Sequence, residues 1–269
     1  RDSAARVDRH RMWRNAARAS RYQGHVVSRP ACLAPIHAPP LSASALRSWQ
    51  PTTLLEKAFL GGTSAAQALA DPRNARAVGV VGETTGYLAL RRMRRRMERH
   101  PIGRAVLHDQ PLISSETMPL AYLESLPAES FGAAYGRFLR KHDFSPDGRD
   151  AVQFVDDSDL AYVMTRYRQV HDLWHVLCGL PPSMKGEVAL KCLEAAQTGL
   201  PMCALAAGGG LLRLPAAQRV QVLMHVGPWA LRHAVGGVDL LCVYYEREMD
   251  KELEQLRSEL AIEPLFKSR

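Results

Sequence analysis

Apolar residues from residue 52 onward recur at steps of three and four, the spacing that places them on one face of an α-helix. No stretch alternates apolar and polar residues for more than a few positions, as a half-buried strand would. The pattern predicts an all-α fold, with a single domain of about seven helices over residues 51–269. The expected helices span residues 52–69, 84–99, 129–142, 158–178, 183–198, 215–234 and 239–261.

Two stretches interrupt this pattern. Residues 79–86 contain several glycines but lack the G-x-G-x-x-G or Lys-Ser/Thr spacing of a phosphate-binding loop, so we interpret them as a turn leading into a helix. Residues 101–127 begin and end with proline and form the longest segment predicted to be irregular.

The charge is unevenly distributed along the chain. The 269 residues have a formal net charge of +8, but residues 1–50 contain nine Arg against two Asp and therefore hold +7 of it. Residues 51–269 contain 26 basic and 25 acidic residues, a balance that argues against nucleic acid as a partner. The five cysteines form no C-x-x-C pair, which favours a reducing compartment.

Residues 1–50 are rich in arginine, alanine and serine and end in a proline-containing stretch. This composition is typical of a mitochondrial transit peptide and linker, and a disordered basic tail is the alternative. No run of 18 apolar residues occurs, so a membrane-spanning helix is not expected.

A second arginine cluster lies in the predicted helix 84–99. It comprises Arg91, Arg92, Arg94, Arg95 and Arg96. A solvated, salt-bridged helix face is the more common meaning of such a cluster. Contact with anionic lipid headgroups is the alternative.

The strongest chemical signal is His171-Asp172-Leu173-Trp174-His175, with Glu187 at the twelfth position after His175. His171 and His175 are one turn apart on the predicted helix 158–178, about 40° around its axis, and Asp172 is about 100° from His171. We therefore expect all three donors to be able to face one point. An apolar stripe at helical spacing places His171 toward the core; it comprises Leu160, Val163, Met164, Tyr167, Trp174 and Cys178.

A turn returns the chain from His175 to Glu187. Gly179 is a suitable helix C-cap, the prolines that follow prevent continuation, and Ser183 can begin a second helix running back along the first. His175 and Glu187 each lie about 6 Å along their helices from this turn. Gly186 leaves room for a close approach of the two helices.

The predicted metal ligands of this helical-hairpin site are His171, Asp172, His175 and Glu187. Two imidazoles and two carboxylates suit Zn²⁺, with Fe²⁺ or Mn²⁺ as alternatives. The protein supplies at most four ligands, and one of the four can hold another ligand in place instead of binding the metal. A coordination position of the metal is then left for water or substrate, which indicates a catalytic metal. The alternative is a pair of hydrogen-bonded core histidines, with both acids on solvated faces.

Two neighbouring features remain open. Lys191 and Glu194 share a helix face with Glu187, and form either a salt-bridge ladder or a support that holds Glu187 in place. A metal phosphohydrolase would need an additional His and a distant Asp, for which His142 and Asp239 are nominal candidates. That hypothesis leaves the spacing of Glu187 unexplained.

With these residues the chain resembles a known family, the zinc-associated mitochondrial coenzyme Q (ubiquinone) biosynthesis proteins that are numbered fourth in the Coq set. The similarity runs from about Pro51 to Ile262. Its motifs are Gly82-Glu83-Thr84-Thr85-Gly86, Ser125-Leu126-Pro127, Phe154-Val155-Asp156-Asp157, Arg166-Tyr167-Arg168, the His-Asp-x-x-His-x11-Glu pattern, residues 194–202 and Tyr244-Tyr245-Glu246-Arg247. The family's metal ligands correspond to His171, Asp172, His175 and Glu187.

The resemblance implies an all-helical protein that is attached peripherally to the matrix side of the mitochondrial inner membrane, in a multi-subunit complex with other Coq proteins. It implies a lyase that removes the C1 carboxyl group of a polyprenylated 4-hydroxybenzoate intermediate, of the 4-hydroxy-3-methoxy-5-polyprenylbenzoate decarboxylase type. In one variant of this reaction the decarboxylation is oxidative, and a hydroxyl group replaces the carboxyl group. The alternative function is a non-catalytic lipid-binding scaffold that assembles the ubiquinone biosynthesis enzymes. A homodimer is compatible with either function.

The chemistry of decarboxylation is compatible with the predicted site. Loss of CO₂ from an aromatic acid needs a proton at the ring carbon and an electron sink, and a Lewis-acidic metal can hold the carboxylate or phenolate. No residue beyond the metal ligands is predicted to be catalytic, and the proton donor stays open. The polyprenyl tail needs an apolar groove, for which helix-face residues are available although such residues are more often core: Leu211, Leu212, Leu214, Val220, Leu223 and Met224.

Overall fold

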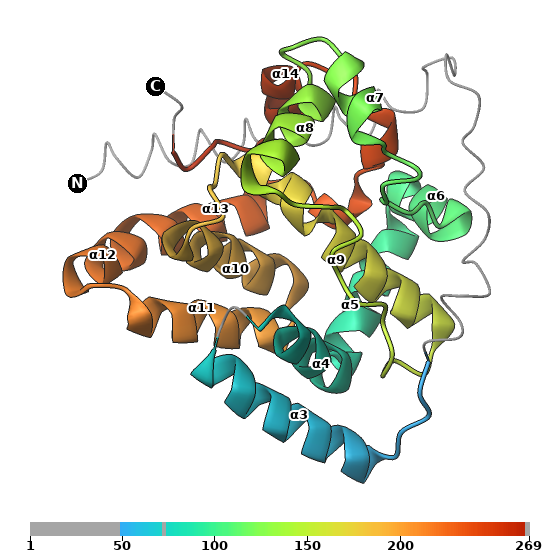
Figure 1. Cartoon of the computed structure of the whole chain (residues 1–269), viewed down its shortest axis with the longest axis vertical. Coiled ribbons are helices and arrows are strands. Elements are labelled where there is room, and N and C mark those ends of the chain that lie inside the picture. The colour runs from blue at the N-terminus through green and yellow to red at the C-terminus, as the bar shows by residue number, and fades with distance from the viewer. Residues whose placement is uncertain (1–48, 72–73, 267–269) are drawn as a thin grey trace.

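The computed structural model describes residues 49–71 and 74–266 (Figure 1). Every extended regular element in this part of the chain is a helix, and the only pairing of strand type is an isolated bridge between Ser130 and Glu252. The predicted all-α, single-domain fold is therefore confirmed. The predicted transit peptide and linker, residues 1–50, lie outside the described residues except for the last two positions.

The α-helices, in chain order, are α3 (Leu54–Ala70), α4 (Ala75–Thr85), α5 (Tyr87–Arg99), α6 (Pro101–Asp109), α7 (Leu120–Ser125), α8 (Phe131–His142), α9 (Ser158–Cys178), α10 (Met184–Thr198), α11 (Pro201–Arg213), α12 (Ala216–Gln221), α13 (Gly227–Gly236) and α14 (Leu253–Glu259). Shorter elements are the π-helix η1 (Val222–Val226) and the 3₁₀-helices η2 (Leu240–Cys242) and η3 (Tyr245–Arg247).

Helix α9 forms the centre of the fold and runs diagonally through Figure 1, in contact with α5, α8 and α10. Both the predicted apolar stripe and most of the opposite face are buried, so the helix is enclosed on nearly all sides. Its start is fixed by the Asp157 side chain, which accepts hydrogen bonds from the backbone N–H groups of Asp159 and Leu160. Side chains on α9 therefore project from a rigid support.

The turn between α9 and α10 follows the prediction. Gly179 ends α9 in the left-handed region at φ +63°, which costs glycine little because it has no Cβ. Ser183 begins α10 by accepting a hydrogen bond from the N–H of Gly186. Helix α10 then runs back beside α9, because Glu187 contacts His175 and Glu194, two turns later, contacts His171. It packs most extensively against α11 and α13. Helices α9 and α10 are thus close to each other around the turn, where the predicted ligands lie.

The structure contains helices that the sequence pattern did not indicate. Helix α4 lies where a turn was expected, α6 and α7 lie within the segment expected to be irregular, and α11 follows Gly199. Close packing accounts for some of the glycines: a Cβ on Gly82 would lie 2.2 Å from the sulfur of Met202, and one on Gly210 would lie 2.5 Å from Cγ2 of Val188. These glycines let helices approach one another, although glycine in sequence more often indicates a turn.

Two predicted helices are wrong in part. Only Leu253–Glu259 is α-helical within the predicted helix 239–261, and η2 and η3 occupy residues 240–242 and 245–247. This segment is buried on several sides, so its closely spaced apolar residues imitate a helical stripe. The predicted helix 215–234 is divided by the π-helix Val222–Val226, which ends two residues before Pro228, a residue with no N–H to donate.

The surface of the described residues has apolar as well as polar regions. None of the helices there combines the length and the apolar character needed to cross a bilayer. Helix α3 nevertheless exposes large apolar side chains, with Leu54 86%, Leu55 84% and Phe59 72% accessible. Such an apolar helix face on a folded protein commonly marks a surface for a partner or a membrane.

Candidate metal centre

Both histidines of the predicted site direct their Nε2 atoms toward the same carboxylate. The His175 Nε2 lies 3.1 Å from Oε1 of Glu187, and the His171 Nε2 lies 3.6 Å from Oε2. One donor atom from each of the three residues lies within 4.8 Å of the others, so this group could hold a metal ion. The helical spacing on α9 and the following turn produce this convergence.

Each imidazole is oriented through its other ring nitrogen. The His175 Nδ1 lies 3.1 Å from the carbonyl oxygen of Leu180, and because a carbonyl oxygen can only accept, this nitrogen carries the proton. The His171 Nδ1 lies 2.5 Å from Oε1 of Glu194. With both Nδ1 atoms donating, both Nε2 atoms face Glu187. A proton on either Nε2 would donate to that carboxylate, and a metal ligand would need the same nitrogen without its proton.

Glu194 is completely buried and is held by charge and hydrogen bonds. The Lys191 Nζ donates to its Oε2 at 2.6 Å, and the Tyr167 hydroxyl donates to the same oxygen. Burial by itself would raise the pKa of Glu194, but the charges of Lys191 and His171 outweigh burial and hold that pKa well below its ordinary value. Glu194 is therefore an ionised acceptor that supports His171, whereas the sequence had suggested a support for Glu187.

Glu187 connects the centre to solvent. Its side chain is 38% exposed, compared with 6% for His171 and 1% for His175. Burial tends to raise the pKa of Glu187, but hydrogen bonds and charge from the two imidazoles hold it well below its ordinary value. The Phe138 ring stacks on His175, with 5.7 Å between the ring centroids. The centre is thus covered on the side of α8 and open beside Glu187.

Asp172 is not a member of the group of three. Its Oδ1 accepts a hydrogen bond at 3.0 Å from Nη2 of Arg149, in the loop of residues 143–157. Adjacent residues on a helix point about 100° apart, so the orientation that brings His171 and His175 together turns Asp172 toward this loop. The structure therefore brings together three of the four predicted ligands. A ligand role for Asp172 stays a prediction.

The chemistry of the three donors fits a divalent cation. Two imidazole nitrogens and one carboxylate oxygen are a common protein ligand set for catalytic zinc, with water or substrate completing the coordination. The same set is also found in non-haem Fe²⁺ proteins. Two buried imidazoles facing an ionised carboxylate are consistent with a site that a cation would complete.

The phosphohydrolase candidates are not part of this group. The His142 ring lies 5.0 Å from the Phe138 ring, at the edge of the centre, while Asp239 pairs with Arg96 of α5 at 3.0 Å. Neither residue belongs to a potential metal-binding group within the described ranges. The arrangement that a His-Asp phosphohydrolase would need is therefore not formed.

Gly186 is needed for the turn between α9 and α10, and not for a close approach of the two helices. A Cβ at this position would lie 1.9 Å from the carbonyl oxygen of Pro181. Because the obstacle is backbone, it can give way only if the turn moves. The residue that follows is Glu187, so a displaced turn would also displace its carboxylate.

We expect Gly186→Ala to lower the free energy of unfolding by about 1–3 kcal/mol, as overpacked sites do. Urea unfolding followed by circular dichroism measures this change. Gly208→Ala is the matched control, because no atom lies within 4 Å of a Cβ there. In a helix that control should be neutral or stabilising by up to about 1 kcal/mol. Equal effects of the two substitutions would show that the contact with Pro181 does not restrict the turn.

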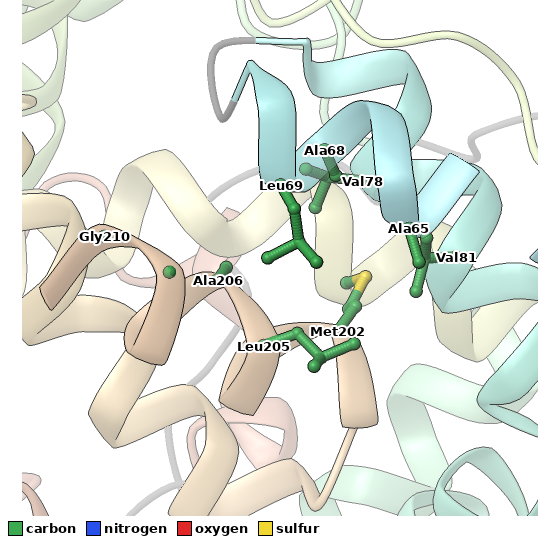
Figure 2. Close-up of a pocket in the computed structure, with 10 residues that line it drawn as sticks. Ala65, Ala68, Leu69, Val78, Val81, Met202, Leu205, Ala206 and Gly210 are labelled. Carbon is green, nitrogen blue, oxygen red and sulfur yellow. The ribbon is translucent and has the colours of Figure 1, made fainter. Parts of the chain in front are cut away.

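An apolar pocket lies between α3, α4 and α11 (Figure 2). Figure 2 shows Leu69, Met202 and Leu205 directed into the same space. The helix-face residues suggested by the sequence do not line it. Val220 of α12 and Met224 of η1, for example, are exposed to solvent. The lining consists of Ala65, Ala68, Leu69, Val78, Val81, Met202, Leu205, Ala206, Gly209 and Gly210.

Helix α11 links this pocket to the metal centre. Met202 lines the pocket, and the thiol of the next residue, Cys203, lies 3.2 Å from the hydroxyl of Tyr167 that donates to Glu194. At the other end of the pocket, Gly210 packs against Val188, which directly follows Glu187. The pocket and the centre therefore share the packing between α10 and α11.

Comparisons with known proteins agree on one family. A family model described as coenzyme Q (ubiquinone) biosynthesis protein Coq4 matches residues 47–265. The chain is 44% identical over 238 residues to the mitochondrial ubiquinone biosynthesis protein COQ4 homolog of Homo sapiens, which covers 88% of this chain and 89% of that protein. It is 46% identical over 214 residues to the corresponding protein of Danio rerio, which covers 79% of each.

A solved structure shares the fold. It is a crystal structure from Nostoc punctiforme, provisionally named as a ubiquinone biosynthesis protein, with a TM-score of 0.59 and 20% sequence identity. The match covers 74% of this chain and 95% of that chain. At this identity the likeness concerns the helical arrangement alone.

Proposed function

The chain belongs to the Coq4 family of coenzyme Q (ubiquinone) biosynthesis proteins, and we propose that it catalyses the metal-dependent removal of the C1 carboxyl group from a polyprenylated 4-hydroxybenzoate intermediate. One observation carries the catalytic part of this proposal. The Nε2 atoms of His171 and His175 and the carboxylate of Glu187 converge at a point that is open to solvent. A purely structural cluster would have no need of that opening.

We propose Zn²⁺ as the resident ion, held by His171, His175 and Glu187. When bound, the ion would supply Lewis acidity to the carboxylate or phenolate of the substrate. The chain supplies the orientation: Glu194 and the carbonyl of Leu180 hold the Nδ1 protons, which prevents either imidazole from rotating away. Fe²⁺ and Mn²⁺ are the alternatives that the donor set also accepts.

Simple decarboxylation balances without an oxidant. The bond between ring carbon C1 and the carboxyl carbon breaks, its electron pair stays with the ring, CO₂ leaves, and a proton bonds to C1. The oxidative variant, in which hydroxyl replaces carboxyl, requires a co-oxidant such as O₂. That variant is more compatible with Fe²⁺ than with Zn²⁺, because zinc has no accessible redox chemistry.

We propose that the polyprenyl tail enters the apolar pocket between α3, α4 and α11. Its free volume of about 40 Å³ is well below the ~300–1,000 Å³ of small-molecule sites, so α3 has to shift to admit the tail. The residues that line the pocket are aliphatic or glycine apart from the thioether of Met202, which suits a hydrocarbon chain. Helix α11 places this pocket beside the packing that positions Glu187 and Glu194. A tail bound there would bring the aromatic head group toward α10.

The related proteins are named mitochondrial, and for this chain we propose peripheral attachment to the matrix side of the inner membrane, within a complex of Coq proteins. The exposed Leu54, Leu55 and Phe59 of α3 support a lipid contact, because Leu69 of the same helix lines the apolar pocket. A membrane beside α3 would allow a lipid substrate to enter without crossing water.

Turnover of a short-tail prenylated 4-hydroxybenzoate tests the catalytic proposal, with CO₂ release and product mass as the readouts. We expect activity from zinc-loaded or iron-loaded protein, and none above background from His175→Ala or Glu187→Gln. Parallel assays in air and under argon separate the oxidative from the simple reaction. Equal turnover by the wild type and both variants would exclude this centre from the chemistry.

The alternative function is a lipid-binding scaffold without catalysis. It is favoured by the exposed apolar face of α3 and by the apolar pocket. Cells carrying Glu187→Gln distinguish the two functions. An assembled complex without ubiquinone would show that scaffolding is insufficient, whereas loss of assembly in step with ubiquinone would favour the scaffold.

A further inference from the structure

The arginine cluster of α5 is only partly neutralised. Arg94 pairs with Asp159 at 2.8 Å, as expected of a salt-bridged helix face. Arg92, Arg95 and Arg99, in contrast, contact no carboxylate among residues 49–71 and 74–266. Isolated exposed arginines are common, but these three lie within two turns on one face of the helix. The cluster therefore concentrates positive charge that the described part of the protein does not balance.

These arginines line a pocket instead of a flat surface. Arg92, Arg95, Arg96 and Arg99 border an open pocket of about 330 Å³ together with residues 196–199 at the end of α10. This volume is at the small end of the range for small-molecule sites, about 300–1,000 Å³. The guanidinium of Arg92 rests against Gly199, where a Cβ would lie 2.9 Å from its Nη2. The neighbouring backbone thus limits the positions that Arg92 can adopt.

The polar side chains at the end of α10 in this pocket are already hydrogen-bonded within the protein. The Gln197 side chain donates to the carbonyl of Val238 and accepts from the N–H of Leu240. The Thr198 hydroxyl is likewise hydrogen-bonded to backbone on both sides. The Nη2 of Arg96, however, is buried without any acceptor. Because this atom has almost no accessible surface, an external acceptor would instead reach the exposed guanidinium groups of Arg92, Arg95 and Arg99.

The charge balance indicates the chemistry of that acceptor. Four guanidinium groups supply four positive charges. The negative charges near them are the carboxylate of Asp239 and about half a charge from the helix dipole at the C-terminal end of α10. A net charge of about +2.5 remains in the pocket. A phosphate group carries nearly two negative charges and offers several acceptor oxygens, and guanidinium groups bind such oxygens in pairs.

We propose that the pocket between α5 and the C-terminal end of α10 is a phosphate-binding site, formed by Arg92, Arg95, Arg96 and Arg99. The phosphate belongs either to a soluble phosphorylated molecule or to the headgroup of a phospholipid. Both sources present the same chemistry to the guanidinium groups. The site is separate from the three metal-binding candidates, none of which lines this pocket.

The full chain is titrated with inorganic pyrophosphate by calorimetry, and its binding to phosphatidylcholine vesicles with and without phosphatidic acid is measured by sedimentation. In whichever of the two assays the wild type binds, Arg92→Gln combined with Arg95→Gln is expected to weaken binding by at least about 10-fold. Each hydrogen bond between charged groups contributes about a factor of 10 to affinity. Arg91→Gln combined with Arg104→Gln removes the same charge from residues outside the pocket, and should change binding less than twofold.

The outcomes separate the two sources and the competing explanations. A response to pyrophosphate supports a soluble ligand, and a response confined to phosphatidic acid vesicles supports a lipid headgroup. Absence of wild-type binding in both assays would overturn the proposal. Equal weakening of binding by the two double variants would also overturn it. So would a loss of thermal stability in the pocket variant without a change in binding, because the arginines would then merely stabilise the end of α10. Loss of pyrophosphate binding in Glu187→Gln but not in the pocket variant would place the anion at the metal centre instead.

Discussion

Purified protein in which Gln replaces Glu187 is expected to contain almost no zinc, whereas the wild type should contain roughly one ion per chain. The substitution keeps the shape of the side chain but removes the single negative charge among the three convergent donors. Both imidazole Nε2 atoms face that carboxylate, at 3.1 and 3.6 Å. A divalent ion beside the two buried imidazoles would be left without charge compensation from the group. Mass spectrometry of metal content after dialysis against zinc measures the effect.

Two other substitutions act as controls for this prediction. Glu116→Gln makes the same chemical change on the surface and should leave the zinc content unchanged. Glu194→Gln keeps all three donor atoms but weakens the hold on His171, so we expect zinc affinity to fall by about 10–100-fold while full loading is recovered in excess zinc. Wild-type zinc content in Glu187→Gln would contradict the assignment of the centre.

The part of this centre that depends on local geometry could be predicted from the sequence. The four-residue spacing of His171 and His175 fixes their relation on α9, and a short turn between Gly179 and Ser183 leaves few paths for the chain before Glu187. These constraints act over fewer than twenty residues and do not depend on the rest of the fold. The convergence of the three side chains was therefore predictable.

The supporting residues depend on packing between elements, which the spacing does not reveal. Glu194 contacts His171 from 23 positions away, and Arg149 contacts Asp172 across the loop before α9. A signal for Glu194 was present, because it shares a helix face with Lys191, but that face could equally have been solvated. A buried pair of this kind becomes recognisable only when α10 and α11 are in place.

The same distinction explains the fold. Strong local signals such as Ser183 at the start of α10 gave correct boundaries, whereas α11 was missed because Gly210 is needed for contact with α10 and not for a turn. The apolar pocket brings α3 and α11 together across more than a hundred residues of sequence. A periodic pattern such as that of residues 52–69 predicts a helix but does not show which other helix it packs against.

Arg166→Met is expected to reduce the free energy of unfolding by about 3–5 kcal/mol, because it leaves a largely buried carboxylate without its cation. Arg166 is completely buried and donates to Oε2 of Glu246 at 2.9 Å and to the carbonyl of Val243 at 3.3 Å. Burial would lower the pKa of Arg166, but the charge and hydrogen bonds of Glu246 outweigh burial, so the group stays charged. The pair joins α9 to the segment that contains η3. Thermal unfolding should show a decrease in Tm of roughly 6–20 °C.

A double substitution separates the ion pair from packing. Arg166→Met combined with Glu246→Leu removes both charges and should recover most of the lost stability, since apolar side chains can replace a buried ion pair at little cost. Arg76→Met is the matched surface control, because Arg76 and Asp150 are exposed and 3.9 Å apart, and it should change stability by less than about 0.5 kcal/mol. If the double variant is no more stable than Arg166→Met, the loss comes from the cavity around α9. The unpaired charge of Glu246 would then not be the cause of the lost stability. It would follow that the ion pair does not hold the η3 segment against α9, the helix that carries both histidines.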